Sequence, residues 1–228
     1  MISPCSPDPL TPHRRKTMTE PMLRKSVGTT VSTLQRNYLD RSQTALGAEA
    51  RGALANLRKY AGRPVSSDPL ALQEVLLLLH PQLSDGELGK GTAPSPSERA
   101  AYTALCLFAM HMQSSTQPMH VAEQTFGFAC GRLHRLSDSK SIKSRFDAML
   151  VSREEAARDV HLRSLVSLLR SRHIPFDYGR FAGDLRSLQN PQYRDGVLLR
   201  WGRDFAIGTT RGDAAETNEA PTSQHTNS

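Results

Sequence analysis

Apolar residues recur along this chain with the spacing of amphipathic helices. The clearest stripe falls at positions i, i+3, i+4 and i+7 and consists of Leu162, Leu165, Val166 and Leu169. A second stripe, nearer the C-terminal end, consists of Leu198, Trp201 and Phe205, which predicts that Trp201 anchors a core. No segment shows the sustained alternation of apolar and polar residues that a half-buried strand requires. The pattern therefore predicts an all-α protein.

Helix-starting residues divide the chain into separate helices. Ser95-Pro-Ser-Glu98 and Ser152-Arg-Glu-Glu155 match the capping box, in which side chains satisfy the first free N–H groups of a helix. Asp68, which precedes Pro69, and Asp177 are further N-cap candidates. These signals predict three helices within residues 152–207 and earlier ones at 31–38, 48–61, 69–79, 96–112, 121–136 and 141–151.

The predicted helices are expected to form two packed bundles, at residues 31–115 and 116–207. The boundary lies near residues 115–119, where Gln-Pro-Met interrupts the helical pattern. Residues 1–30 are rich in Pro, Ser and Thr, which predicts a flexible N-terminal extension. Residues 208–228 are polar throughout and are predicted to be a disordered tail.

Charge favours a polyanionic partner. The chain carries a formal net charge of +7, and the tail carries −2, which leaves +9 for the rest. Each phosphate that Lys or Arg neutralises releases condensed counterions, so a surplus of this sign suits nucleic acid.

The cysteine pattern suits a reducing compartment. Cys5, Cys106 and Cys130 form no CxxC pair, so neither a disulfide framework nor a cysteine-rich zinc site is indicated, and a cytoplasmic location is expected. The longest apolar run, residues 75–79, is far too short to cross a bilayer, so no membrane partner is expected. No histidine pair has metal-binding spacing, and no cofactor or metal is expected.

Basic residues are organised in two places. A cluster able to form one positive surface for a sugar-phosphate backbone comprises Arg132, Arg135, Lys143 and Arg145. Arg51 and Arg58, seven residues apart, share one face of the 48–61 helix. Aromatic residues make up only 6% of the chain and none alternates with the cluster, so base stacking is expected to be minor.

Two alternative functions remain open at this point. Cys130 and His134 are four residues apart, so a helix would place them on one face, the minimum for a thiol activated by a base. No third orienting group is evident near them, and the sequence offers no positive case for an enzyme. A free-standing helical DNA-binding regulator would need a recognition helix with base-reading side chains, but no tight helix-turn-helix signature occurs.

Three segments occur in an order and spacing that a known family shares. They are Leu54-Ala-Asn-Leu-Arg-Lys-Tyr-Ala-Gly62, then Gly131-Arg-Leu-His-Arg-Leu136 with Arg145-Phe146, and finally the stretch from His161-Leu-Arg to Trp201-Gly-Arg-Asp-Phe205. With these segments the chain resembles the CasB-type small subunit (Cse2 family) of Cascade, the type I-E CRISPR surveillance complex. The resemblance spans roughly residues 30–207.

This resemblance implies a non-catalytic helical protein of two bundles that acts in antiviral defence. A pair of such subunits lines the belly of the complex, supports the heteroduplex of crRNA and target DNA, and holds the displaced strand of the R-loop. The implied partners are the other Cascade subunits, the crRNA and target DNA backbones, and a second copy of this chain. The residues that match the family's positive, nucleic-acid-binding surface are Arg51, Arg58, Arg132, Arg135, Lys143 and Arg145.

Overall fold

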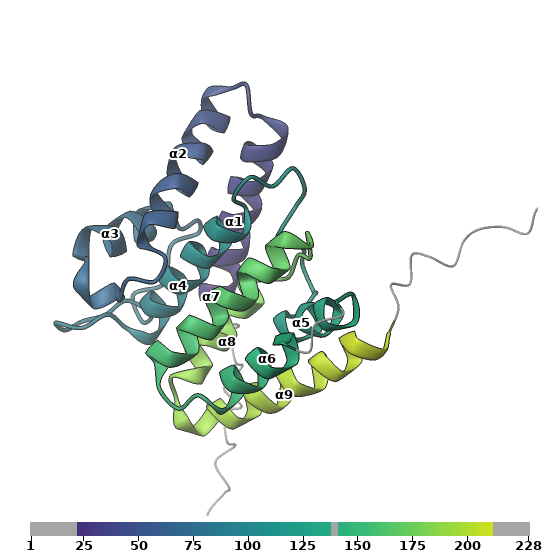
Figure 1. Ribbon diagram of the computed structural model, residues 1–228. Helices are drawn as coiled ribbons and strands as arrows, with labels where there is room; N and C mark the ends of the chain where they lie inside the picture. The colour runs from purple at the N-terminus through teal and green to yellow at the C-terminus, as the bar shows by residue number, and fades with distance from the viewer. Residues whose placement is uncertain (1–21, 138–140, 212–228) are drawn as a thin grey trace, which may run out of the picture.

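The computed structural model describes residues 22–137 and 141–211, and within them it confirms the predicted all-α fold (Figure 1). These residues form nine α-helices and one short 3₁₀ turn, with a single isolated bridge between His120 and Phe176 in place of any strand. In chain order the elements are α1 (Met22–Asp40), α2 (Ala45–Tyr60), η1 (Val65–Ser67), α3 (Pro69–Leu78), α4 (Pro96–His111), α5 (Phe126–Arg135), α6 (Ser141–Val151), α7 (Glu155–Ser171), α8 (Tyr178–Leu188) and α9 (Pro191–Thr210).

Three of the four predicted helix N-caps are confirmed in atomic detail. Ser95 and Glu98 form the full capping box at the start of α4, and Asp68 accepts a hydrogen bond from Ala71 N at the start of α3. Asp177 does the same for Arg180 N before α8. Because each of these side chains satisfies a backbone N–H that the helix cannot, a local pattern was enough to locate the start.

The second predicted capping box is wrong. Helix α7 begins at Glu155 with Glu154 at the N-cap, and Glu154 makes no capping hydrogen bond. The Ser152 hydroxyl instead donates to the carbonyl of Ala148, at the C-terminal end of α6. The Ser152 carbonyl also accepts a hydrogen bond from Arg158. The Ser152 side chain therefore bonds to the end of α6 and does not cap the start of α7.

The predicted N-terminal extension is too long. Helix α1 begins at Met22, within the range 1–30, and its Leu23 and Val27 side chains are completely buried. The N–H of Leu23 donates to the buried carboxylate of Glu87, which holds this first turn in place. Ser and Thr residues lower the helix propensity of this stretch, so only burial reveals it. The rest of the extension, residues 1–21, lies outside the described residues.

The predicted start of the C-terminal tail, at residue 208, is also slightly too early. Helix α9 continues to Thr210, so residues 208–210 of the predicted tail are helical, and Gly208 is buried against α5. Residues 212–228 of that tail lie outside the described part of the chain.

An aromatic core joins the two halves of the chain. Helix α8 lies against α1, α4 and α9, so it contacts helices on both sides of the predicted boundary at residues 115–119. Trp201, predicted to be a core anchor, is completely buried and lies against Phe126 and Phe181. One apolar cluster therefore spans both predicted bundles, and the division into 31–115 and 116–207 stays a prediction.

Helices α5 and α9 pack unusually closely along a line of glycines. A Cβ atom added at Gly131 would overlap the carbonyl oxygen of Phe205 on α9, and one added at Gly208 would overlap the carbonyl oxygen of Phe128 on α5. Only residues without a side chain allow two backbones to approach this closely. This contact sets the position of α5, the helix that carries the first two residues of the predicted basic cluster.

A buried histidine makes the stability of this core depend on pH. His111 is completely buried, and its Nδ1 lies 3.0 Å from the Tyr178 hydroxyl. Burial, together with a smaller effect of the Arg170 charge, lowers the pKa of His111 from 6.5 to about 3. Below pH 6.5 the unfolded chain binds a proton that the folded chain does not, so this contribution to stability is present above pH 6.5 and is lost toward pH 3.

We expect acidification to destabilise the fold through this group by up to about 1.4 kcal/mol per pH unit. Urea unfolding between pH 7 and 4.5 measures the slope, and His111→Asn should flatten it. Some slope should remain, because burial also lowers the pKa of His120. His173→Asn is the control, since His173 is exposed with φ 52°, a conformation that Asn tolerates. Equal slopes for the wild type and His111→Asn would show that His111 is not the source of the pH dependence.

Candidate nucleic-acid interface

Helix α5 presents the first part of the predicted basic cluster. Thr125 caps the helix by accepting a hydrogen bond from Phe128 N, and Phe126, Cys130 and Leu133 bury its apolar face. Arg132 and Arg135 lie in its last turn, where Arg135 is exposed and Arg132 is half-buried. The partial negative charge at a helix C-terminus stabilises cations in that turn, which favours both arginines there.

Helix α6 follows α5 directly and contacts it, and it carries the other two residues of the cluster. Lys143 and Arg145 are both exposed. Arg145 donates a hydrogen bond to Ser164 on α7, so its guanidinium is held across two helices. The structure therefore brings the four residues of the cluster onto neighbouring helices.

Lys143 has an acidic partner on its own helix. Its ammonium lies 2.6 Å from the carboxylate of Asp147, one helical turn later. This neutralises part of the charge that was assigned to the cluster, although an exposed pair of this spacing contributes only about 0.3–0.5 kcal/mol to stability. The i,i+4 spacing of Lys143 and Asp147 in the sequence already favours this ion pair.

Arg51 and Arg58 lie in a different part of the molecule. Both are on α2, which packs on α1, α3 and α4, whereas α5 packs mainly on α9, and Figure 1 shows α2 well away from α5 and α6. Arg51 is exposed and donates to the carbonyl of Ser42, while Arg58 is half-buried. The six predicted residues thus form two separate groups, one on α2 and one on α5 and α6.

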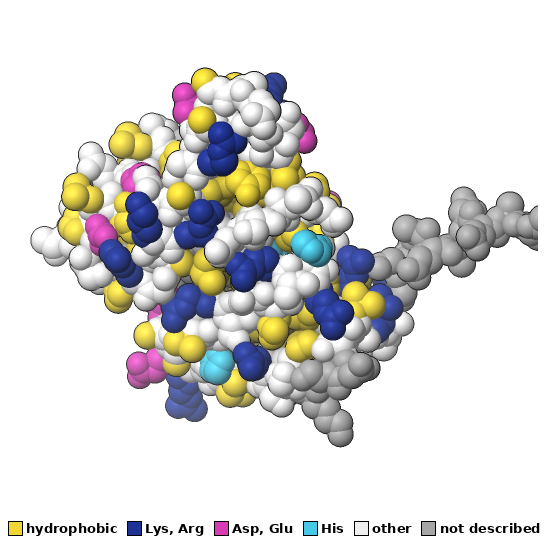
Figure 2. All heavy atoms as spheres, turned by 45° about the horizontal axis from the view of Figure 1, so that its top comes forward, with side chains coloured by type: hydrophobic (Ala, Val, Ile, Leu, Met, Phe, Trp, Pro, Cys, Tyr) yellow, Lys and Arg dark blue, Asp and Glu magenta, His cyan; other side chains and the backbone are white. Residues whose placement is uncertain are grey.

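One face of the molecule is basic in character. Figure 2 shows Lys and Arg side chains spread over one face of the molecule, with the acidic side chains mostly toward its edges. Dispersed basic side chains of this kind contact phosphates without regard to the base sequence. Trp201 is buried, so it is not available for base stacking. The arrangement is suited to backbone contacts.

The cysteine and histidine that were considered for catalysis are poorly placed for it. Cys130 is completely buried, and desolvation raises the pKa of its thiol well above the ordinary value. The ring of His134 stacks on Phe205, with 5.7 Å between ring centroids. A nucleophile must form a thiolate and reach a substrate, and burial opposes both.

The described residues offer neither a metal site nor a membrane span. Within residues 22–137 and 141–211, no group of three or more His, Cys, Asp or Glu side chains could hold a metal ion. None of the helices in that part of the chain is long and apolar enough to span a membrane.

Comparison with known proteins identifies the family to which the chain is similar. The model of the family CRISPR-associated protein Cse2 matches residues 53–205. The crystal structure of CasB from Thermobifida fusca superposes with a TM-score of 0.64 and 28% sequence identity, covering 80% of this chain and 97% of that one.

A second structure supports the fold alone. It is a CRISPR-associated protein of the Cse2 family from Thermus thermophilus, with a TM-score of 0.53 and 22% identity over 79% of this chain and 97% of that one. No curated protein sequence matches the chain. Because the family match spans well over half of its length, the chain belongs to the Cse2 family of CRISPR-associated proteins.

Proposed function

We propose that this chain is a non-catalytic small subunit of a type I-E CRISPR surveillance complex in the cytoplasm. The family match over residues 53–205 is the observation that carries the proposal. In this role the chain supports the crRNA–target heteroduplex and holds the displaced DNA strand, in company with the other Cascade subunits and a second copy of itself. Guide pairing then reads the sequence, and this subunit contributes contacts to the backbones.

The proposed contacts come from the two basic groups. Arg132, Arg135 and Arg145 lie on the contacting helices α5 and α6, and we expect them to contact one strand together. Lys143 contributes less because Asp147 offsets its charge. Arg51 and Arg58 on α2 are far enough away to contact a different part of the nucleic acid. Such contacts stabilise an open R-loop without selecting its sequence.

Membership of the complex can be tested directly. The tagged protein is purified from its native host at moderate salt, the proteins that accompany it are identified, and any bound RNA is sequenced. Recovery of repeat-derived guide RNA with the other subunits would support the proposal. Recovery of the protein alone, with those subunits demonstrably expressed, would contradict it and favour the free-standing DNA-binding regulator.

We expect the double variant Arg132→Ala, Arg135→Ala to weaken retention of target DNA by the assembled complex. Loss of two phosphate contacts should lower the slope of log K against log salt concentration by about 1–2. Filter binding at several salt concentrations measures both quantities. The matched control is Lys90→Ala with Arg172→Ala, which removes two exposed charges from elements outside α2, α5 and α6.

Two results would separate charge from folding. Arg132→Lys with Arg135→Lys keeps the charge and should restore most of the salt slope. The melting temperature of each variant shows whether the half-buried Arg132 also matters for stability. Unchanged affinity and salt dependence in the double alanine variant would remove these two residues from the proposed surface.

A further inference from the structure

Helix α7 lies between the two groups of basic residues that are proposed to bind nucleic acid. It contacts α4, α5 and α6, and in Figure 1 it runs between α2 and α6. The sequence has no acidic residue between Asp159 on this helix and Asp177 before α8. Arg163, Ser167 and Arg170, which we call the α7 stripe, lie on one face of this acid-free part and are half-buried. The α7 stripe therefore offers two positive charges and a hydroxyl without a carboxylate among them.

Arg163 connects the α7 stripe to the α2 group. Its guanidinium lies against Gly62, two residues beyond the end of α2, where an added Cβ would be 3.2 Å from it. Arg58 lies in the last turn of α2, immediately before this contact. The positive charge of the stripe therefore begins where the α2 group ends.

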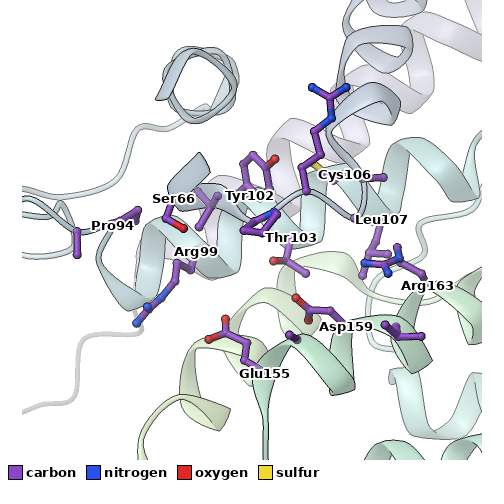
Figure 3. A pocket seen from close by; sticks show the side chains of 18 residues that line it. Ser66, Pro94, Arg99, Tyr102, Thr103, Cys106, Leu107, Glu155, Asp159 and Arg163 are labelled. Carbon is purple, nitrogen blue, oxygen red and sulfur yellow. The ribbon is translucent and has the colours of Figure 1, made fainter. Parts of the chain in front are cut away.

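A cavity of about 490 Å³ between α4, α7 and residues 61–66 lies beside this contact. Figure 3 shows Arg163 at one end of the cavity and Arg99 at the other, with Glu155 and Asp159 between them. Arg163 interacts with Asp159, one helical turn earlier, so part of its charge is already offset. The carboxylates stand in the first turns of α7, and the stripe leads away from them toward the other end of the helix.

Arg145 connects the α7 stripe to the group on α5 and α6. It donates a hydrogen bond from α6 to Ser164, the residue after Arg163. Arg170 lies two turns, about 10 Å, farther along α7. It donates to the side chain of Gln113, just beyond α4, at 2.6 Å on the surface. A guanidinium has five N–H donors, so one such hydrogen bond leaves others for a phosphate.

We propose that α7 carries one unpaired strand of nucleic acid across the molecule, through phosphate contacts from Arg163, Ser167 and Arg170. The strand contacts Arg58 on one side of α7 and Arg145 on the other, so the two basic groups bind one strand rather than two. A single strand can follow side chains on three helices, whereas duplex DNA is stiff over about 150 base pairs. This inference rests on the proposed function and adds to it three residues and a path.

The test uses the full-length protein and two labelled single strands of oligo(dT), of about 8 and about 24 nucleotides. Fluorescence anisotropy at several salt concentrations measures the affinity and the salt slope. The long strand reaches both basic groups at once, so the wild type should bind it at least about tenfold more tightly than the short one. Arg163→Gln with Arg170→Gln should remove most of this difference. It should also lower the salt slope for the long strand by about 1.4, which corresponds to two phosphate contacts.

Two further variants separate the α7 stripe from general effects of charge and folding. Lys90→Gln with Arg153→Gln removes two exposed charges outside α2, α5, α6 and α7 and should leave the preference for the long strand unchanged. Arg163→Lys with Arg170→Lys keeps the charge and should restore most of the salt slope. Thermal unfolding shows whether each variant is folded.

Several results would overturn the path. Equal binding of the short and long strands by the wild type, tighter binding of duplex DNA than of the single strand, or unchanged binding in the α7 glutamine variant would each do so. Arg132→Ala with Arg135→Ala, measured in the same assay, separates this failure from failure of the proposed function. If that variant weakens binding and the α7 variant does not, the strand passes elsewhere and the proposed function stands. If neither variant matters, the proposed nucleic-acid surface is wrong as well.

Discussion

Gly131→Ala should destabilise the protein by about 3 kcal/mol or more, since overpacking of a tight core costs this much when backbone must move. The added Cβ would overlap the carbonyl oxygen of Phe205 and lie 2.9 Å from Thr209 N. Both are backbone atoms of α9, so no side-chain rotation can relieve the clash. An added Cβ at Gly127 or Gly208 would likewise overlap backbone of the facing helix, so the two helices are close along this whole line of glycines.

Gly202→Ala is the matched control, because Gly202 lies on α9 and a Cβ there meets nothing within 4 Å. Alanine favours the helix over glycine by about 1 kcal/mol, so this variant should be as stable as the wild type or more stable. Urea unfolding monitored by circular dichroism measures both. If Gly131→Ala proved as stable as Gly202→Ala, the close α5–α9 contact would be refuted.

Asp184→Ala should cost about 1–3 kcal/mol of unfolding free energy, because it leaves the buried N–H of Trp201 without an acceptor. The Asp184 carboxylate accepts a hydrogen bond from Trp201 Nε1 at 2.6 Å and another from Arg200. Trp201 is completely buried, so its N–H cannot turn to water once the acceptor is gone. These hydrogen bonds connect α8 to α9 beside the aromatic core.

A double-mutant cycle with Trp201→Phe separates this hydrogen bond from general packing. Phe lacks the N–H, so the combined variant should lose less stability than the sum of the single variants, with a coupling of about 1–3 kcal/mol. Asp195→Ala, at an exposed acidic residue of α9, should be nearly neutral. Strictly additive losses would show that the carboxylate does not stabilise Trp201.

Both predictions bear on function through α9. This helix holds α5 by the glycine contact and holds α8 by the Asp184 hydrogen bonds, so it fixes the direction in which Arg132 and Arg135 project. If the proposed function holds, a variant that loosens α9 should therefore weaken the proposed nucleic-acid contacts as well as stability. Measuring stability first is necessary before a loss of binding is assigned to a charge.

The helices and several of their limits could be predicted because their signals are local. Ser95 and Glu98 lie within one helical turn, so the capping box depends on no other part of the chain. Ser152 shows the limit of this reasoning, since its hydroxyl had an alternative acceptor in the preceding helix. The basic cluster on α5 and α6 could be predicted for the same reason: its residues are close in sequence and lie on consecutive helices.

The sequence by itself determined an all-α fold, a basic surface and a burial pattern that made Trp201 a core residue, because periodicity, caps and charge are properties of neighbouring residues. Only the tertiary structure decided that α1 starts at Met22, that α8 joins the two halves, and that Arg51 and Arg58 lie apart from the other basic residues. It also brought Glu155 and Asp159 into a cavity with residues 61–66. Each of these features depends on contacts between residues that are distant along the chain. The free energy of such contacts cannot be predicted from the pattern of neighbouring residues.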